Sequence, residues 1–320
     1  MNIHAFVPAS RPGLETAHFL RNSDLSDHEL RSLLEVAYQI KIEPESCRDS
    51  LKHRAIVLMF EKPSLRTRMT FELAAAQLGA LAVFQDHRDG RIGEREPARD
   101  IARNLDRWFD AIVARTYSHR TLEQLAQWSS VPVINALSES YHPCQALADF
   151  LTIRERFGSF EDLRIAYVGD GNNVAHSLMY CAAQLGVSIS VCGPPGFGPR
   201  EADLAVATAV AEAHGSTVDV VADIREAVRD AAAVYTDVWT SMGWEDETQQ
   251  RRIAFDAYQI NEAVMALARE DAIFMHCLPA LRGQEVSDAV IESDRSVVFD
   301  QAENRLHAHK ALLMMMVNGA

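Results

Sequence analysis

The chain has 320 residues, of which 48% are hydrophobic and 24% charged, a composition that excludes a disordered or fibrous protein and indicates a globular one. It has 31 Lys and Arg residues against 45 Asp and Glu residues, so its formal net charge is −14. Because such a surface repels phosphate backbones and anionic lipids, the sequence argues against general binding to nucleic acid or to a membrane surface.

Several features of the sequence bear on the cellular compartment. The chain has no apolar run near the roughly 18 residues that cross a bilayer. Residues 1–20 lack the charged and apolar segments of a secretory signal. The five cysteines are scattered without a C-x-x-C pair, which favours reduced thiols over a disulfide or zinc framework. We therefore expect a cytoplasmic protein; the cysteines are Cys47, Cys144, Cys181, Cys192 and Cys277.

The predicted elements alternate between helices and buried strands. The first helix begins after Ser26, because Ser26 and Glu29 have the spacing of a capping box and apolar residues then repeat at helical spacing. Short continuous apolar runs follow, and such runs fit strands buried on both faces of a parallel sheet. A first series lies at residues 55–60, 81–84, 111–115 and 132–136, and a second at residues 164–170, 188–193, 217–221, 233–238, 272–278 and 296–300.

Helix-patterned segments separate most of these runs, so the sequence predicts an α/β protein with doubly wound parallel sheets. The break between the two series lies at residues 142–160, where we expect a long amphipathic helix between two domains. In open α/β sheets, ligands bind beyond the carboxyl ends of the strands. Polar residues that directly follow a strand are therefore the candidates for a functional site.

The first candidate follows the strand at residues 55–60. Ser64, Arg66, Thr67 and Arg68 come just before a helix that we expect to begin near Met69. The free N–H groups and dipole of a helix N-terminus favour an anion, and arginine binds phosphate oxygens through two parallel hydrogen bonds. The alternative is a helix cap with solvated arginines.

Two further candidates follow strands of the first series. Arg115 closes the run at residues 111–115 and is either a structural ion pair or a ligand contact. His142 and Gln145 open a helix and lie three residues apart, so they share one face and are able to converge on one small polar group. The alternative for His142 is a helix cap.

The segment 168–173, Val-Gly-Asp-Gly-Asn-Asn, resembles the start of a dinucleotide fingerprint. Position 174 is Val, however, where the third glycine of the fingerprint stands, and no acidic residue clearly ends the following strand to hold a ribose. The sequence therefore argues against NAD binding.

The last candidates follow strands of the second series. Asp237 is suited to hold an ammonium group, and Cys277 is either a thiolate, a polar contact or a small buried apolar residue. His276 precedes Cys277 directly, and adjacent side chains on an extended chain point apart. This geometry argues against a pair in which His276 activates Cys277.

Together, these segments resemble the carbamoyltransferase family in order and spacing from about His18 to the C-terminus. The Ser64-x-Arg66-Thr67-Arg68 loop, Arg115 and His142-Pro143-x-Gln145 resemble the family's carbamoyl-phosphate site. Two segments are similar to the ornithine branch: Asp237-x-Trp239-x-Ser241-Met242-Gly243 and His276-Cys277-Leu278-Pro279. Aspartate enzymes carry H-P-L-P at the latter place and lack the S-M-G loop. The segment Glu303-Asn304-Arg305-Leu306-His307 also matches.

The resemblance implies carbamoyl transfer from carbamoyl phosphate to the δ-amine of L-ornithine, giving L-citrulline and phosphate in arginine metabolism, without a metal or an organic cofactor. It assigns catalysis to Cys277, Arg115, His142 and Asp237. The ornithine-binding residues it implies are Asn173, Asp237, Ser241 and Met242. Those for carbamoyl phosphate are Ser64, Leu65, Arg66, Thr67, Arg91, Arg115, His142, Gln145, Cys277, Leu278 and Arg305.

The resemblance also implies the architecture. It places the site in the cleft between a carbamoyl-phosphate domain, residues 1–145, and an ornithine domain, residues 146–300. The last helix, about residues 301–320, packs back on the first domain. We expect a cis Leu278–Pro279 bond and a homotrimer, or a multiple of trimers, in which residues 86–96 complete the site of a neighbouring subunit.

The chain departs from the family pattern at two positions. Leu65 stands where ornithine enzymes have a threonine, which removes one hydroxyl donor to phosphate, and Arg91 stands where the neighbouring loop has Gln or His. We hypothesise that Arg91 offsets Leu65. Because of Leu65, a sister enzyme that uses N-acetylornithine, N-succinylornithine or putrescine is an alternative function. An alternative of another class is a degenerate homologue that acts as a binding or regulatory subunit. The sequence leaves open an anabolic or catabolic role.

Overall fold

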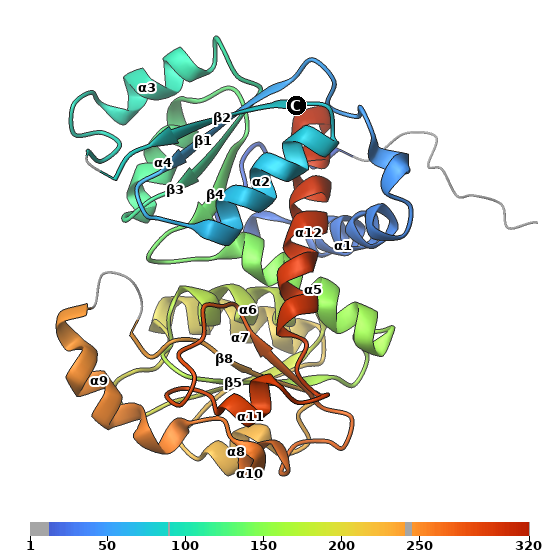
Figure 1. Ribbon diagram of the computed structural model, residues 1–320, viewed down its shortest axis with the longest axis vertical. Coiled ribbons are helices and arrows are strands. Elements are labelled where there is room, and N and C mark those ends of the chain that lie inside the picture. Colours follow the sequence, from blue (N-terminus) through green and yellow to red (C-terminus); the bar gives the residue numbers. More distant parts are fainter. Residues whose placement is uncertain (1–12, 89, 241–244, 320) are drawn as a thin grey trace, which may run out of the picture.

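The computed structural model describes residues 13–88, 90–240 and 245–319. Figure 1 shows two sheet-containing regions, one above the other, with helix α12 (Val298–Gly319) running from the lower region into the upper one. Within the described residues, no helix combines the length and the apolar character that a membrane span requires.

The upper region contains a parallel sheet with the strand order β2-β1-β3-β4. Its strands are β1 (Ala55–Phe60), β2 (Leu81–Asp86), β3 (Ala111–Arg115) and β4 (Val133–Leu137). The accompanying helices are α1 (Asp27–Ile42), α2 (Leu65–Gln77), α3 (Ala98–Leu105) and α4 (His119–Trp128), with 3₁₀ turns at Asn22–Asp24 and Pro44–Cys47. The predicted capping box is present, because Ser26 and Glu29 each accept a backbone N–H from the other residue.

The lower region contains a second parallel sheet with the order β7-β6-β5-β8-β9. Its strands are β5 (Arg164–Val168), β6 (Ser188–Cys192), β7 (Val218–Val221), β8 (Ala233–Thr236) and β9 (Ile273–His276). Its helices are α6 (Asn173–Leu185), α7 (Glu201–Ala213), α8 (Ile224–Val228), α9 (Thr248–Phe255), α10 (Glu262–Met265) and α11 (Asp288–Ile291), with 3₁₀ turns at Glu245–Glu247 and Asp256–Tyr258. The predicted two-domain α/β fold with doubly wound parallel sheets is confirmed.

Each sheet has one point where its chain order reverses. In the first sheet the reversal lies between β1 and β3, and in the second it lies between β5 and β8. Such reversals leave a crevice outside the carboxyl ends of the two strands, where ligands of doubly wound sheets bind. The segments that follow β1, β5 and β8 contain several of the candidate residues, and Arg115 ends β3.

Two helices join the regions. Helix α5 (Pro143–Phe157) packs against α12, and α12 also contacts α1 and α2 of the upper region. One apolar core extends from Leu58 in the first sheet through Leu147 and Leu312 to Ile165 in the second. Helix α12 is buried along most of its length because α1, α2 and α5 pack around it.

Three sequence predictions require correction. Residues 296–300 are not a strand: Ser296 makes a single bridge to Phe274, and α12 begins at Val298. Short apolar runs fit a strand or a buried helix equally well, and here the valines begin the helix that leaves the sheet. Helix α2 begins at Leu65 rather than near Met69, because the Ser64 hydroxyl accepts the Thr67 N–H. Strand β2 lies at an edge and is half-exposed rather than buried on both faces.

Candidate active site

A cavity of about 740 Å³ opens where the carboxyl ends of the two sheets face one another. Eleven of the residues predicted from the sequence line it: Ser64, Leu65, Arg66, Thr67, Arg115, His142, Asn173, Asp237, Cys277, Leu278 and Arg305. They come from segments far apart in the chain, which the two strand reversals and helix α12 bring together.

One half of the cavity is built for an anion. Ser64 caps α2, so the first N–H groups of that helix lie at the cavity wall. The buried Arg305 donates hydrogen bonds to Thr67 Oγ1, at 2.5 Å, and to Gln145 Oε1. The buried Arg115, at the end of β3, supplies a second guanidinium.

Three buried nitrogens in this half have no hydrogen-bond partner among the described residues. They are Nε of Arg115, Nε of Arg305 and Nδ1 of His142. Buried polar atoms are normally paired, and each unpaired one costs free energy. Unpaired nitrogens of cavity-lining side chains therefore indicate a site for a ligand that carries several acceptor oxygens.

Burial sets the charge of these side chains. It lowers the pKa of Arg115 to about 10, with a contribution from the nearby Arg305, so Arg115 stays cationic at neutral pH. Burial, and then the charges of Arg305 and Arg115, hold the pKa of His142 well below its usual value. His142 is therefore a neutral imidazole, and it is able to donate one N–H to a carbonyl oxygen without adding charge.

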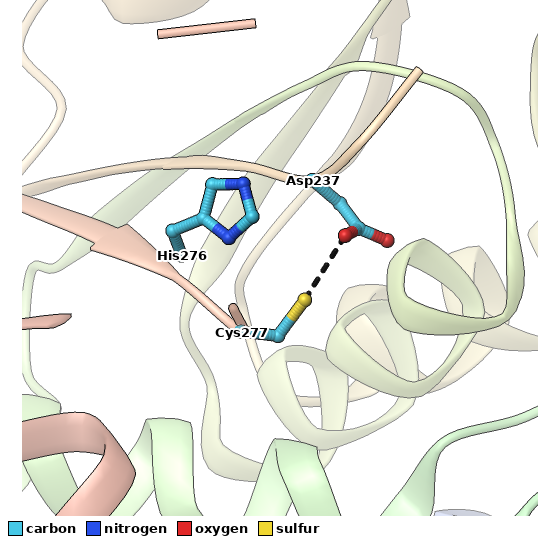
Figure 2. Close-up of side chains that lie close together, drawn as sticks. All are labelled: Asp237, His276 and Cys277. Carbon is cyan, nitrogen blue, oxygen red and sulfur yellow. Dashed lines mark hydrogen bonds between the residues drawn. The ribbon is translucent and has the colours of Figure 1, made fainter. Parts of the chain in front are cut away.

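The other half of the cavity carries the pair shown in Figure 2. Cys277 Sγ donates a hydrogen bond to Asp237 Oδ1 at 3.0 Å. Asp237 Oδ2 accepts from Asn172 Nδ2 at 2.9 Å. Burial and the neighbouring Asp237 carboxylate raise the pKa of the Cys277 thiol well above its usual value. Cys277 is thus a protonated thiol, and the Asp237 carboxylate is the negative group of this half.

His276 lies beside this pair in Figure 2, and ligand atoms of Asp237, His276 and Cys277 are within 4.8 Å of one another. Both ring nitrogens of His276 are used elsewhere, however. Nδ1 accepts the Leu278 N–H at 2.8 Å, so Nε2 carries the proton and donates to Glu285 at 3.1 Å. His276 is held for a structural role, in agreement with the sequence argument that it does not activate Cys277.

Comparison with known proteins agrees with this geometry. Residues 17–155 match the carbamoyl-phosphate-binding domain of the aspartate/ornithine carbamoyltransferases, and residues 161–316 match their aspartate/ornithine-binding domain. The chain belongs to the aspartate/ornithine carbamoyltransferase family.

Relatives with assigned names are similar over nearly their whole length. The ornithine carbamoyltransferase of Acidothermus cellulolyticus is 48% identical over 303 residues, which cover 95% of this chain and 97% of that protein. The solved structure of the Pyrococcus furiosus ornithine carbamoyltransferase has a TM-score of 0.93 at 44% identity, covering 96% of this chain and 99% of that one. The solved enzyme of Gloeobacter violaceus has a TM-score of 0.86 at 43% identity, covering 94% and 98%.

The structure places the remaining predicted residues of this family member elsewhere. Gln145 is buried beneath the cavity and bonded to Arg305. Arg91 is exposed, and its guanidinium lies 4.7 Å from the centre of the Tyr117 ring, outside the cavity lining. Ser241 and Met242 lie outside the described residues. The Leu278–Pro279 bond is cis, as expected.

Several lining residues were not among those predicted to bind a ligand. Asp170, Asn172 and Arg251 line the lower half of the cavity, and Arg251 donates to Asp170 at 2.6 Å. Asp170 and Asn172 belong to the 168–173 segment that the sequence singled out. Arg251 lies on α9 and gives no sequence signal, because an arginine on a polar helix is typical of a solvent-exposed face.

Gly171 explains how the turn after β5 approaches its neighbour. A Cβ atom there would lie 2.2 Å from Gly198 C and from Pro199 N, so the close contact between the two loops requires glycine. The contact holds Asp170, Asn172 and Asn173 at the cavity wall.

Proposed function

We propose that the protein transfers the carbamoyl group of carbamoyl phosphate to the δ-amine of L-ornithine, giving L-citrulline and phosphate. One observation carries the proposal: a pocket with two buried guanidiniums and unpaired donors shares one cleft with a carboxylate–thiol pair. The first half suits a dianionic acyl phosphate, and the second suits an amine. The names of the relatives support the same reaction.

In this mechanism, the first turn of α2, with Ser64, Arg66 and Thr67, holds the phosphate together with Arg305. Arg115 and the neutral His142 donate to the carbamoyl oxygen, where negative charge develops in the tetrahedral state. Arg115 supplies full charge and His142 only a dipole. Carbamoyl phosphate is already an activated acyl donor, so the reaction needs no organic cofactor.

The amine reacts only after it loses a proton, because its pKa lies near 10 and the ammonium has no lone pair. Asp237 orients the amine and accepts its hydrogen bonds, and the Cys277 thiol holds Asp237 from the other side. The neutral nitrogen, whose ammonium proton has passed to solvent, attacks the carbonyl carbon and a C–N bond forms. The C–O bond to phosphate then breaks, and the second proton of the nitrogen leaves with the phosphate. Asn173, Ser241 and Met242 would bind the amino-acid end of ornithine.

The two halves make separate predictions for kinetics. Arg66→Ala should raise the KM for carbamoyl phosphate at least about tenfold, because it removes a charge-assisted contact to phosphate. Asp237→Asn should lower kcat/KM for ornithine about 100-fold or more, with carbamoyl-phosphate binding within about threefold of wild type. Steady-state citrulline assays and calorimetry separate these effects. If Asp237→Asn left ornithine kinetics unchanged, the proposed amine site would be wrong.

The proposal extends to a homotrimer. On α2, Leu65, Met69 and Leu73 are spaced by four residues and are 74%, 57% and 46% exposed, so they form an apolar stripe on one helix face. Helix α2 contacts the edge strand β2, where Leu81 and Val83 are also exposed. A stripe that begins at the cavity supports an interface between copies of the chain. Arg91, on the loop after β2, would then reach a neighbouring subunit's phosphate site.

We further propose that the enzyme works in the cytoplasm, in arginine biosynthesis. The support for this role is the name of one relative, the anabolic ornithine carbamoyltransferase of Pyrococcus furiosus, which is 45% identical over 298 residues that cover 92% of this chain.

A further inference from the structure

A buried carboxylate lies beneath the cavity. Asp149 is on α5, one helical turn after Gln145, and is fully buried. It does not line the cavity. Its Oδ1 accepts hydrogen bonds from Gln145 Nε2 at 2.7 Å and from Gln301 Nε2 at 2.6 Å. Its Oδ2 accepts from the Tyr235 hydroxyl at 3.2 Å.

The two glutamines lead from Asp149 to opposite halves of the site. Gln145 Oε1 accepts from Arg305, which donates in turn to Thr67 in the anion half. Gln301 Oε1 accepts the backbone N–H of His276 at 3.0 Å, one residue before Cys277 in the amine half. One buried carboxylate therefore connects to both halves through hydrogen-bonded amides.

The donors and acceptors permit only one orientation of each amide. A guanidinium only donates, so Gln145 must turn its oxygen to Arg305 and its NH₂ to Asp149 Oδ1. Gln301 is fixed in the same way between Asp149 and the backbone N–H of His276. Without an acceptor at position 149, the NH₂ group of Gln145 loses its partner, and that of Gln301 keeps only the Tyr235 hydroxyl, at 3.2 Å. Each amide is then held mainly from its oxygen side, so the groups that it orients are less firmly fixed.

We infer that Asp149 is a positioning residue for carbamoyl transfer. It fixes Arg305 through Gln145, and it fixes the backbone at His276 and Cys277 through Gln301. This inference rests on the proposed function, because it takes Arg305 to bind carbamoyl phosphate. It adds a residue that touches neither substrate and yet sets the geometry of both halves.

Two substitutions separate the acceptor oxygen from the negative charge. Asp149→Asn keeps an oxygen toward both glutamines, since Oδ1 alone accepts their NH₂ groups and the Tyr235 hydroxyl is able to rotate to accept the new N–H. Asp149→Leu has a similar size and no acceptor. The Kd for carbamoyl phosphate, measured by calorimetry, should stay within about threefold of wild type for Asp149→Asn. It should rise at least about tenfold for Asp149→Leu, or about 1.4 kcal/mol.

Tyr235→Phe is the matched control. It removes the third hydrogen bond to Asp149 and the 3.2 Å bond from Gln301 Nε2 to the Tyr235 hydroxyl, and it leaves the bonds of Asp149 to both glutamines. Its unfolding free energy should fall while its Kd stays close to wild type. If Asp149 has only a structural role, Tyr235→Phe and Asp149→Leu variants of similar stability should bind carbamoyl phosphate with the same Kd. That pattern would overturn the inference.

A double-mutant cycle tests the route through Gln145. If Asp149 acts through it, adding Asp149→Leu to Gln145→Leu should raise the Kd no further than Gln145→Leu alone. Additive losses would contradict that route. Should Asp149→Leu fail to fold, the smaller Asp149→Val, which also lacks an acceptor, takes its place with the same expected results.

Binding separates this inference from the proposed function. A wild-type protein that binds carbamoyl phosphate without making citrulline would refute the function, and the Kd values of the variants would still decide the role of Asp149. A folded Asp149→Leu variant that binds as tightly as wild type would refute the positioning role whatever the activity. A wild-type protein that does not bind carbamoyl phosphate would refute both.

Discussion

At the scale of single residues, the cleft is defined by which groups are charged and which are not. Arg115 is cationic, whereas burial keeps His142 and the Cys277 thiol neutral at pH 7. In the proposed function, the Asp237 carboxylate bonded to that thiol accepts from the amine. The site thus offers positive charge where phosphate and a developing oxyanion would lie, and negative charge where an amine would approach.

The sequence predicted those side chains that directly follow strands, because strand ends meet at one edge of a parallel sheet. It did not predict Arg251 or Asp149 as site residues. Both lie within helices, where a polar residue is typical of a solvent-exposed face until the packing of other helices is known. Helix α12 covers Asp149, and no local pattern in α5 indicates that.

The reactivity of Cys277 tests its predicted protonation state. Only the thiolate reacts with iodoacetamide. Because burial and Asp237 raise the pKa of Cys277, alkylation should be slow at pH 7, and its rate should still rise with pH beyond the usual pKa of a thiol. Asp237→Asn removes the negative charge, lowers that pKa and should speed alkylation at a given pH. Mass spectrometry of the Cys277 peptide gives the rate, with urea-unfolded protein as the control. Alkylation at pH 7 as fast as in urea would contradict this description.

At the scale of elements, every described strand of the two sheets overlaps a predicted apolar run, since most strands of parallel sheets are nearly continuous in apolar character. The prediction of a strand at residues 296–300 is wrong because the same apolar pattern also begins a buried helix. The predicted start of α2 lies four residues too late, because Ser64, and not a later polar residue of this segment, caps the helix. The apolar pattern predicts where a segment lies, whereas side-chain hydrogen bonds determine where the segment ends.

Glu61, which follows β1, holds two loops at this edge. It is buried, and its carboxylate accepts the Ile92 N–H at 2.8 Å and the Tyr117 N–H at 2.6 Å. Glu61→Gln turns an NH₂ group toward one of these donors, so the unfolding free energy should fall by about 1–3 kcal/mol. Urea denaturation measures the loss.

The control for this prediction is Glu94→Gln. Glu94 accepts the Arg91 N–H in the same loop, but it is exposed to solvent. Its substitution should change the unfolding free energy by no more than about 0.5 kcal/mol. Equal effects of the two substitutions would show that Glu61 does not anchor the loops.

At the scale of the whole molecule, α5 and α12 make the two regions share one core while their strand ends stay apart. The cavity is the space that this arrangement leaves between the sheets. Neither region alone contains both halves of the site, so a substrate that spans the cleft contacts side chains of both. The exposed stripe on α2 supports the proposed assembly of several chains.

Assembly is tested by charging that stripe. Light scattering should give three chains, or a multiple of three, for the wild type. Met69→Glu combined with Leu73→Glu should give a monomer, because two carboxylates would have to be buried in the interface. Ile253→Glu on α9, which replaces an apolar side chain that is 73% exposed, is the control and should leave the assembly unchanged. A monomeric wild type, or an unchanged mass for the double variant, would refute the trimer.

The most direct test of the central claim is the choice of amine. The purified protein would be given carbamoyl phosphate with L-ornithine, N-acetylornithine, N-succinylornithine, putrescine or L-aspartate in parallel, and the carbamoylated product would be measured. Citrulline from ornithine should form with a kcat/KM at least about 100-fold above that for any other amine. Turnover only with an acylated amine or putrescine would reassign the substrate, and no product from any of the five would contradict catalysis by this cleft.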